Sequence, residues 1–197
     1  MTIGDSSTLP AWRRDLERAL KRNRGDAHSR YFQLASVSAD GSPRNRTVVF
    51  RGFAPDSHDL LVISDDRAAK HTELLHNSAV AIAWYFSRSR EQFRVVGNAV
   101  VATCDNDTQR WRQRLWSALS DPAKAQFFWP APGAPLSSAS QSTSSHDQGS
   151  HTAAPPDNFT VIAVSPVSVD HLQLTNPQRR FKSHWDGEHW SACEVNP

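Results

Sequence analysis

Two short stretches of the sequence carry cationic side chains at a spacing that suits the binding of an anion. The first, "SDDRAAKHTELL", reads as the end of a strand followed by a helix. Arg67 and Lys70 are three residues apart and share a face in the first helical turn, where free backbone N–H groups and the helix dipole favour an anion. The expected guest is a phosphate. Asp65 and Asp66 oppose an anion unless they cap the helix, and the alternative interpretation is a pair of solvated surface cations.

The second stretch is "DGSPRNRTVVFRGF", residues 40–53, in which arginines interrupt a β-branched strand. In a straight strand Arg46 and Val48 face one side, while Thr47 and Arg51 face the other. A buried arginine needs an anionic or hydrogen-bonding partner, because an unpaired buried charge is strongly destabilising. The neighbouring segment "YFQLASVS" contains no carboxylate, so a bound phosphate is one expected partner. The alternative is an edge strand whose arginines extend into solvent.

The elements that must position these cations follow from hydrophobic periodicity. Trp12, Leu16 and Leu20 recur at four-residue spacing and predict a helix that opens near Pro10. Asp40-Gly41 is a hairpin signal between two strand-like runs. Further strands are predicted at 58–66, 79–86, 91–104 and 158–174, and a hairpin with its turn at Asp186-Gly187 is predicted at 179–195. Helices are predicted at 67–77, where Asp65 or Asp66 can cap the first turn, and at 107–120.

The predicted architecture is one domain, residues 1–197, without internal repeats. Six or more strands at hairpin spacing with few helices favour a mostly antiparallel barrel decorated with helices. Residues 137–154 are rich in Ser, Thr and His and lack large apolar side chains, which predicts a flexible loop. The segment "QFFWPAPGAP" has no periodicity, and it could cover either a cofactor or a dimer interface.

Composition excludes several classes of function. The chain is 38% hydrophobic and 21% charged, and its formal charge of +2 is too small for general nucleic-acid binding. We expect no membrane partner, because no apolar run reaches spanning length. The two cysteines favour a reducing compartment, and we place the protein in the cytoplasm. His71 and His76 are five residues apart and do not share a helical face, so no metal site is expected.

Four segments, taken together, resemble the pyridoxamine 5′-phosphate oxidase-like flavoproteins, the FMN-binding split barrels. These are "LASVSADGSPRNRTVVFRGF", "LLVISDDRAAKHTELLHNSAVAIAWYF", "REQFRVVGNAVV" and "VDHLQLTNPQRRFKSHWDGEHWSACEVNP". The resemblance covers residues 30–104 and 158–197, whereas 107–120 and the loop beyond match poorly. It implies a mostly β fold, a six-stranded antiparallel split barrel with flanking helices, that forms homodimers with FMN at the interface.

The resemblance also implies roles for ten residues. Arg46 and Lys70 correspond to positions that reach the FMN phosphate, and Arg67 is expected to join them. Arg51 stands where the oxidase keeps a lysine near the flavin and the substrate phosphate. The remaining residues correspond to positions around the flavin ring and ribityl chain, with the amide side chain supplied by the partner subunit: Thr47, Val48, Ile63, Ser64, Gln92 and Arg180.

The sequence departs from the oxidase where that enzyme holds its substrate. Asn176-Pro177-Gln178 replaces an Arg-x-His pair, and "RQRLWSALSDPAK" has no equivalent of the tyrosine and arginine that bind the substrate phosphate. An amide cannot make the charge-assisted bonds of a guanidinium. The expected function is therefore that of an FMN-dependent oxidoreductase of unknown substrate, with no catalytic residue assigned.

Two other classes of function remain open at this point. In one, the barrel is a non-catalytic carrier or sensor that binds flavin or haem. In the other, the basic segment "RRDLERALKRNRGDAHSRYF" and the tryptophans bind single-stranded nucleic acid. Acidic residues interrupt that basic segment, so we expect no nucleic-acid partner.

Overall fold

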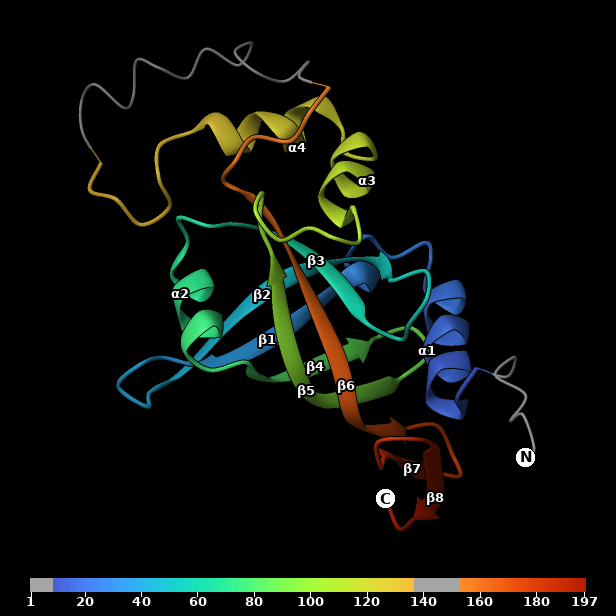
Figure 1. Ribbon diagram of the computed structural model, residues 1–197. Helices are drawn as coiled ribbons and strands as arrows, with labels where there is room; N and C mark the ends of the chain where they lie inside the picture. Colours follow the sequence, from blue (N-terminus) through green and yellow to red (C-terminus); the bar gives the residue numbers. More distant parts are fainter. Residues whose placement is uncertain (1–8, 137–152) are drawn as a thin grey trace, which may run out of the picture.

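Within residues 9–136 and 153–197, which the computed structural model describes, eight strands form one antiparallel sheet in the order β3-β2-β1-β4-β5-β6-β7-β8 (Figure 1). β3 also pairs with β6, from Leu60 opposite Val164 to Asp65 opposite Phe159. This pairing closes the first six strands into a barrel, which confirms the predicted fold. The strands are β1 (Tyr31–Val37), β2 (Pro43–Phe53), β3 (Leu60–Asp65), β4 (Ala79–Phe86), β5 (Glu91–Ala102), β6 (Phe159–Gln173), β7 (Arg179–Trp185) and β8 (Trp190–Val195).

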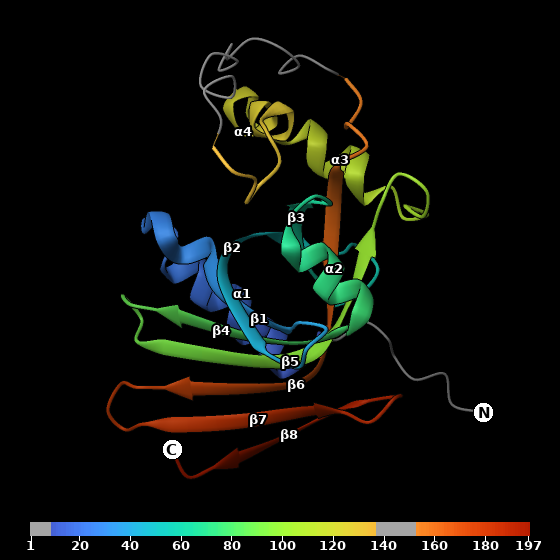
Figure 2. The same ribbon diagram turned by 90° about the vertical axis from the view of Figure 1, so that its left-hand side faces the viewer.

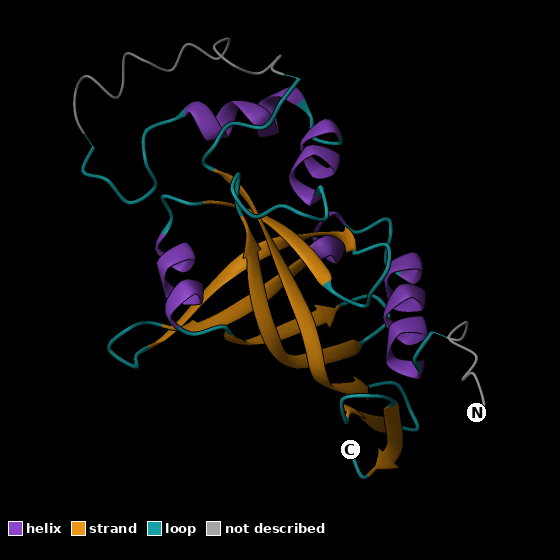
Figure 3. Cartoon of the chain, viewed as in Figure 1, coloured by secondary structure: helices purple, strands orange, loops and turns teal. Residues whose placement is uncertain are grey.

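The helices lie around the barrel rather than inside it (Figures 1 and 3). α1 and α2 are on opposite sides, while α3 and α4 lie beyond the end where β5 stops and β6 starts. β7 and β8 continue the sheet below the barrel (Figure 2). The helical elements are α1 (Ala11–Arg22), η1 (Ala27–Arg30), α2 (Ala69–His76), α3 (Trp111–Ser117), α4 (Asp121–Ala125) and η2 (Gln126–Phe128).

The barrel interior is filled by alternating side chains. β4 alternates exposed and buried residues along its whole length, the period expected of a strand with one face in the core. Trp84 is fully buried at the centre, against Phe32 and Phe50, and its Nε1 donates to the Ser29 carbonyl oxygen over 3.0 Å. A second cluster, which includes Trp116, packs beneath α3 and η2.

β5 and β6, which pair antiparallel, approach each other very closely at one point. A Cβ atom placed on Gly97 would lie 2.2 Å from the carbonyl oxygen of Ser165, much closer than atoms can approach. The pairing register shifts at the same point, between Val96 and Gly97. Only glycine permits the two backbones to pass at this distance.

A buried ionic cluster connects α1 to the barrel. His171 on β6 is 1% exposed, and its Nε2 lies 3.0 Å from Glu91 Oε2. Its Nδ1 lies 3.4 Å from Asp15 Oδ2 on α1. Arg22, also on α1, pairs with Glu91 over 2.9 Å. The helix is therefore held by charged contacts at two of its turns.

Several predicted boundaries differ from those in the structure. The first helix and the hairpin at Asp40-Gly41 are confirmed. α2 begins at Ala69, its N-cap Ala68 makes no side-chain cap, and the Asp65 carboxylate instead accepts from the Arg67 backbone N–H. α3 is shorter than the predicted helix at 107–120. Of the loop predicted at 137–154, residues 137–152 lie outside the described residues.

Candidate cofactor-binding site

A cavity of about 460 Å³ lies on the outer face of β2 and β3, beside the first turn of α2. Residues 123–132, which include α4's end and η2, form its opposite wall. The cavity therefore combines a strand face, a helix start and an aromatic segment. Six of the ten predicted site residues line it: Thr47, Val48, Arg51, Ile63, Ser64 and Lys70.

Arg51 lines this cavity and lies at a bulge in β2. Phe50 pairs with Val62 and Gly52 with Leu61, so Arg51 is the extra residue between them. The Nε atom of Arg51 is buried, and no hydrogen-bond partner for it lies among the described residues. Burial lowers the pKa of the Arg51 guanidinium, and the charge of Arg30 lowers it further. Arg51 thus presents a partly desolvated cation with an unused donor.

Lys70 contributes a second cation from the first turn of α2. Its side chain lines the cavity, and burial lowers the pKa of its ammonium group. The positive charge of Arg46 lowers this pKa further, while Asp65 and Glu73 act in the opposite direction. The start of α2 has no side-chain cap, so the positive end of the helix dipole adds to the same potential.

The chemistry of these donors fits a phosphate group. Two cations that are both made less basic by burial and by a neighbouring positive charge gain stability when an anion comes between them. Because Arg51 and Lys70 both line the cavity, an anion there can accept charge-assisted hydrogen bonds from both. The hydroxyl groups of Thr47 and Ser64 border the cavity and suit a polar chain such as ribityl. The residues present therefore fit the phosphate end of FMN.

Arg46 lies close to this cavity but is already paired. Its guanidinium donates to the Glu73 carboxylate, to Ser36 Oγ and to the Leu34 carbonyl oxygen. The carboxylate partner that the hairpin lacks is supplied by α2. Arg46 is not among the residues that line the cavity, and its predicted role at the phosphate stays a prediction.

Arg67 is held away from the cavity. Its guanidinium forms two hydrogen bonds with the Asp65 carboxylate, 2.9 and 2.6 Å long, and it also donates to the carbonyl oxygens of Phe127 and Trp129. Arg67 does not line the cavity. Its expected contact with the phosphate likewise stays a prediction.

The last two predicted residues lie elsewhere in the sheet. Gln92, near the start of β5, borders a separate hollow of about 400 Å³ on the outer face of β1, β2, β4 and β5. Thr47 borders both hollows. Arg180 on β7 pairs with Asp170 through two hydrogen bonds of 3.0 and 2.8 Å, and borders neither hollow. One chain alone does not bring these two residues to the cavity.

The wall at 123–132 was not assigned by sequence reasoning. Its aromatic and proline residues were recognised, but the sequence left open whether they cover a cofactor or a dimer interface. In the structure Phe127, Trp129, Pro130 and Pro132 line the cavity, together with Ala123 and Gln126. The signal that pointed to this role was a run of large apolar residues without periodicity, which a surface loop does not need.

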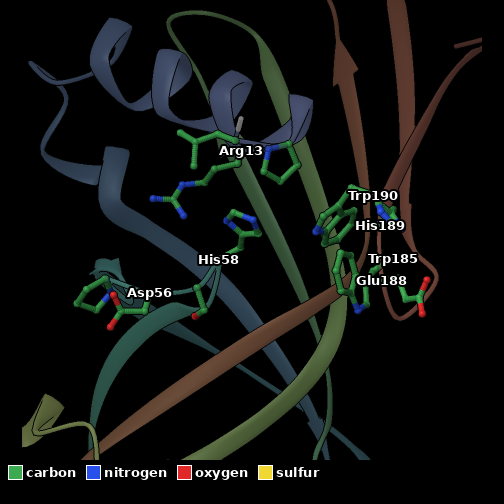
Figure 4. A pocket seen from close by; sticks show the side chains of 11 residues that line it. Arg13, Asp56, His58, Trp185, Glu188, His189 and Trp190 are labelled. Atoms are coloured by element: carbon green, nitrogen blue, oxygen red, sulfur yellow. The ribbon is translucent and has the colours of Figure 1, made fainter. Parts of the chain in front are cut away.

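A larger cavity, of about 680 Å³, lies between the start of α1, the β2–β3 loop and the β7–β8 hairpin (Figure 4). Trp185 and Trp190 form one side and His58 the other. Its lining carries charges of both signs and includes none of the ten predicted residues. The volume of a cavity alone therefore does not identify the cofactor site.

In the described part of the chain, no group of three or more His, Cys, Asp or Glu side chains is placed to hold a metal ion. None of the helices in those residues is long and apolar enough to cross a membrane.

Comparison with known proteins gives consistent results. A family model described as "Pyridoxamine 5′-phosphate oxidase, FMN-binding domain" matches residues 9–103. The chain is 34% identical over 193 residues to "Pyridoxine/pyridoxamine 5′-phosphate oxidase 2" of Arabidopsis thaliana, covering 94% of this chain and 96% of the relative. Both matches include the strands and the helix that line the cavity.

Solved structures extend the likeness to the fold. A "pyridoxamine 5′-phosphate oxidase-related, FMN binding protein" from Nostoc punctiforme superposes with a TM-score of 0.88 and 39% identity, over 96% of this chain and all of that one. PhzG from Burkholderia lata shares the fold with a TM-score of 0.75 at 18% identity, over 98% of this chain and 100% of that one. The coverage, the barrel and the cationic cavity agree: this chain belongs to the pyridoxamine 5′-phosphate oxidase-like family of FMN-binding split barrels.

Proposed function

We propose that this chain binds FMN in the cavity between β2, β3, α2 and residues 123–132, and acts as an oxidoreductase. The observation that carries the proposal is the pair of desolvated cations, Arg51 and Lys70, one of which has an unused buried donor. When bound, FMN supplies the capacity to accept a hydride. The residues of this chain bind and orient it: the cations hold the phosphate end, and the face of β2 and β3 supports the rest.

The names of the relatives support both parts of this proposal. The Arabidopsis relative is named as an oxidase and the Nostoc structure as an FMN-binding protein. The proposal leaves the substrate unassigned, because Asn176-Pro177-Gln178 replaces the oxidase's Arg-x-His pair. The cytoplasm is the proposed compartment, on the basis of cysteine usage alone.

We also propose that the protein is a homodimer in which the partner completes the flavin site. The outer face of β4 and β5 exposes Tyr85, Val96 and Val100, each more than half exposed. A sheet face that leaves several apolar side chains in water favours a protein interface. The hollow that contains Gln92 lies on the same face and meets the cavity at Thr47, so a second copy seated there would lie next to the flavin.

The test is FMN affinity, measured by the change in flavin fluorescence on binding. Lys70→Gln and Arg51→Gln are each expected to weaken binding about 10- to 150-fold, because each removes a charge-assisted hydrogen bond of about 1.5–3 kcal/mol. Lys21→Gln, an exposed change on α1, is the matched control for loss of one positive charge. Equal affinities in all four proteins would contradict the proposed site. Reduction of the bound flavin by candidate amines and alcohols distinguishes an enzyme from a carrier.

A further inference from the structure

Arg67 is part of a polar network that holds the aromatic wall of the cavity. Its Nη1 donates to the Trp129 carbonyl oxygen over 3.1 Å and its Nη2 to the Phe127 carbonyl oxygen over 3.3 Å. The Asp65 carboxylate fixes the guanidinium through a two-bond fork. A planar guanidinium held in this way has a fixed direction for its remaining donors.

Asn158 makes the same connection from the start of β6. Its Nδ2 donates to Asp65 Oδ2 over 3.0 Å and to the Phe127 carbonyl oxygen over 2.9 Å. The backbone carbonyl oxygen of Asn158 accepts a hydrogen bond from the backbone N–H of Asp66 over 3.0 Å. Two side chains from distant parts of the sequence therefore converge on the same backbone carbonyl of the wall.

Phe127 in this wall packs edge-on against Trp116 and Phe159, and the segment that follows it is more exposed. η2 is a single 3₁₀ turn, and the chain after it runs through Trp129, Pro130 and Pro132 along the cavity. Proline removes backbone donors, so such a segment cannot be fixed by pairing with a strand. Trp129 is 48% exposed, and its position depends on the backbone that Arg67 anchors.

We infer that Arg67 is a positioning residue that fixes the 126–132 wall over the flavin cavity, and that it is not a ligand of the phosphate. This inference rests on the proposed function of the cavity. The guanidinium already donates to four acceptor positions on Asp65, Phe127 and Trp129. Lys70 differs in charge environment: burial lowers its pKa, whereas the hydrogen bonds that Arg67 donates to Asp65 raise the pKa of Arg67.

Comparing FMN with riboflavin distinguishes the two roles, because riboflavin has the same ring and ribityl chain without the phosphate. Arg67→Gln is expected to weaken the binding of both by the same factor, about 3- to 10-fold for the lost hydrogen bonds. Lys70→Gln is expected to weaken FMN only. Asn158→Ala should reproduce the Arg67→Gln pattern, and the double variant should fall short of the product of the two single effects. Arg114→Gln, exposed on α3, is the control.

Hydrogen exchange of the flavin-free protein supplies a readout that does not depend on the cofactor. Arg67→Gln is expected to raise amide exchange in residues 126–132 by about 3- to 10-fold, the loss expected for these hydrogen bonds, while exchange in β4 is unchanged. Unchanged exchange at 126–132, or a loss of affinity confined to FMN, would overturn the inference. If exchange rises as expected but the wild-type protein binds neither flavin, the proposed function fails while the anchoring role of Arg67 stands.

Discussion

Three arginines near one cavity have three different environments. Arg46 is paired with a carboxylate of α2, Arg51 lines the cavity and has a buried donor with no partner among the described residues, and Arg67 anchors a wall. The same residue type thus contributes to stability, to ligand binding and to positioning. Which role applies depends on the partner that the fold supplies, not on the side chain itself.

Replacing Arg46 by Gln is expected to reduce stability rather than flavin affinity alone. Glu73 is 8% exposed and would lose its cationic partner, at a cost of about 1.5–3 kcal/mol. Urea unfolding of the flavin-free protein measures the change, and the double variant Arg46→Gln, Glu73→Gln should recover part of it. An unchanged urea midpoint combined with lost FMN affinity would instead assign Arg46 to the phosphate.

For single residues, the sequence predicted the type of chemistry more reliably than it predicted the contacts that each side chain makes. The arginines and Lys70 were recognised as anion-binding candidates from their types and spacing, and Lys70 and Arg51 do share a cavity. The Glu73 partner of Arg46 was missed because it lies on another element. Side-chain pairing across elements depends on tertiary packing, which local periodicity does not encode.

Among the elements, α1 is attached to the barrel through titratable groups. Burial raises the pKa values of Asp15 and Glu91, but their polar partners together outweigh burial and lower both: His171 and Arg18 for Asp15, and His171, Ser89 and Arg22 for Glu91. Burial would lower the pKa of His171, but the two carboxylates outweigh it and raise that pKa. Arg18 and Arg22 add positive charge on the helix side. The attachment is therefore strongest when the histidine is protonated and both carboxylates are ionised.

The contribution of His171 to stability is expected to depend on pH. Because its folded pKa is raised, this contribution is fully present below its unfolded pKa of about 6.5 and is lost as pH rises through the folded pKa. The contribution of the carboxylates is present above about pH 4 and is lost as pH falls through their lowered pKa values. The difference in unfolding free energy between wild type and His171→Gln should therefore shrink from pH 6 to pH 9. A difference that is constant with pH would show that folding leaves the pKa of His171 unshifted, and a difference that grows with pH would show that folding lowers it.

A variant at Gly97 tests the close approach of β5 and β6. Gly97→Ala is expected to destabilise the protein by about 3 kcal/mol or more, because the added carbon meets backbone atoms that cannot move independently. Gly25→Ala is the control, since no atom lies within 4 Å of its added carbon, and its effect should stay within about 1 kcal/mol. Thermal unfolding of both variants measures the contrast, and equal melting temperatures would rule out the close approach.

Strands were easier to predict than helix ends. Alternating apolar residues and the Asp-Gly turns at 40–41 and 186–187 located the hairpins. The start of α2 was misjudged because the aspartate expected to cap it binds Arg67 instead. α3 stops at Ser117 although the helical pattern continues to residue 120, because local periodicity alone does not mark where a helix ends.

At the scale of the whole molecule, the proposed homodimer is the feature that can be tested. Val96→Lys places a charge on the outer face of β5, where the side chain is 53% exposed, so the barrel itself should tolerate it. We expect sedimentation analysis to show a dimer for the wild-type chain and a monomer for this variant, with weakened FMN binding. Lys21→Gln on α1 is the control. A monomeric wild-type protein that retains FMN would contradict the proposed interface.

The pairing of β3 with β6 also determines when the cavity comes into existence. Ser64 and Asp65 stand opposite Thr160 and Phe159, so residues far apart in the chain must meet before this wall is complete. Long-range strand pairing of this kind forms slowly. A small molecule that binds against the completed wall has no binding site during the early steps of folding. We therefore expect such a molecule to prolong the lifetime of the native barrel without hastening its formation.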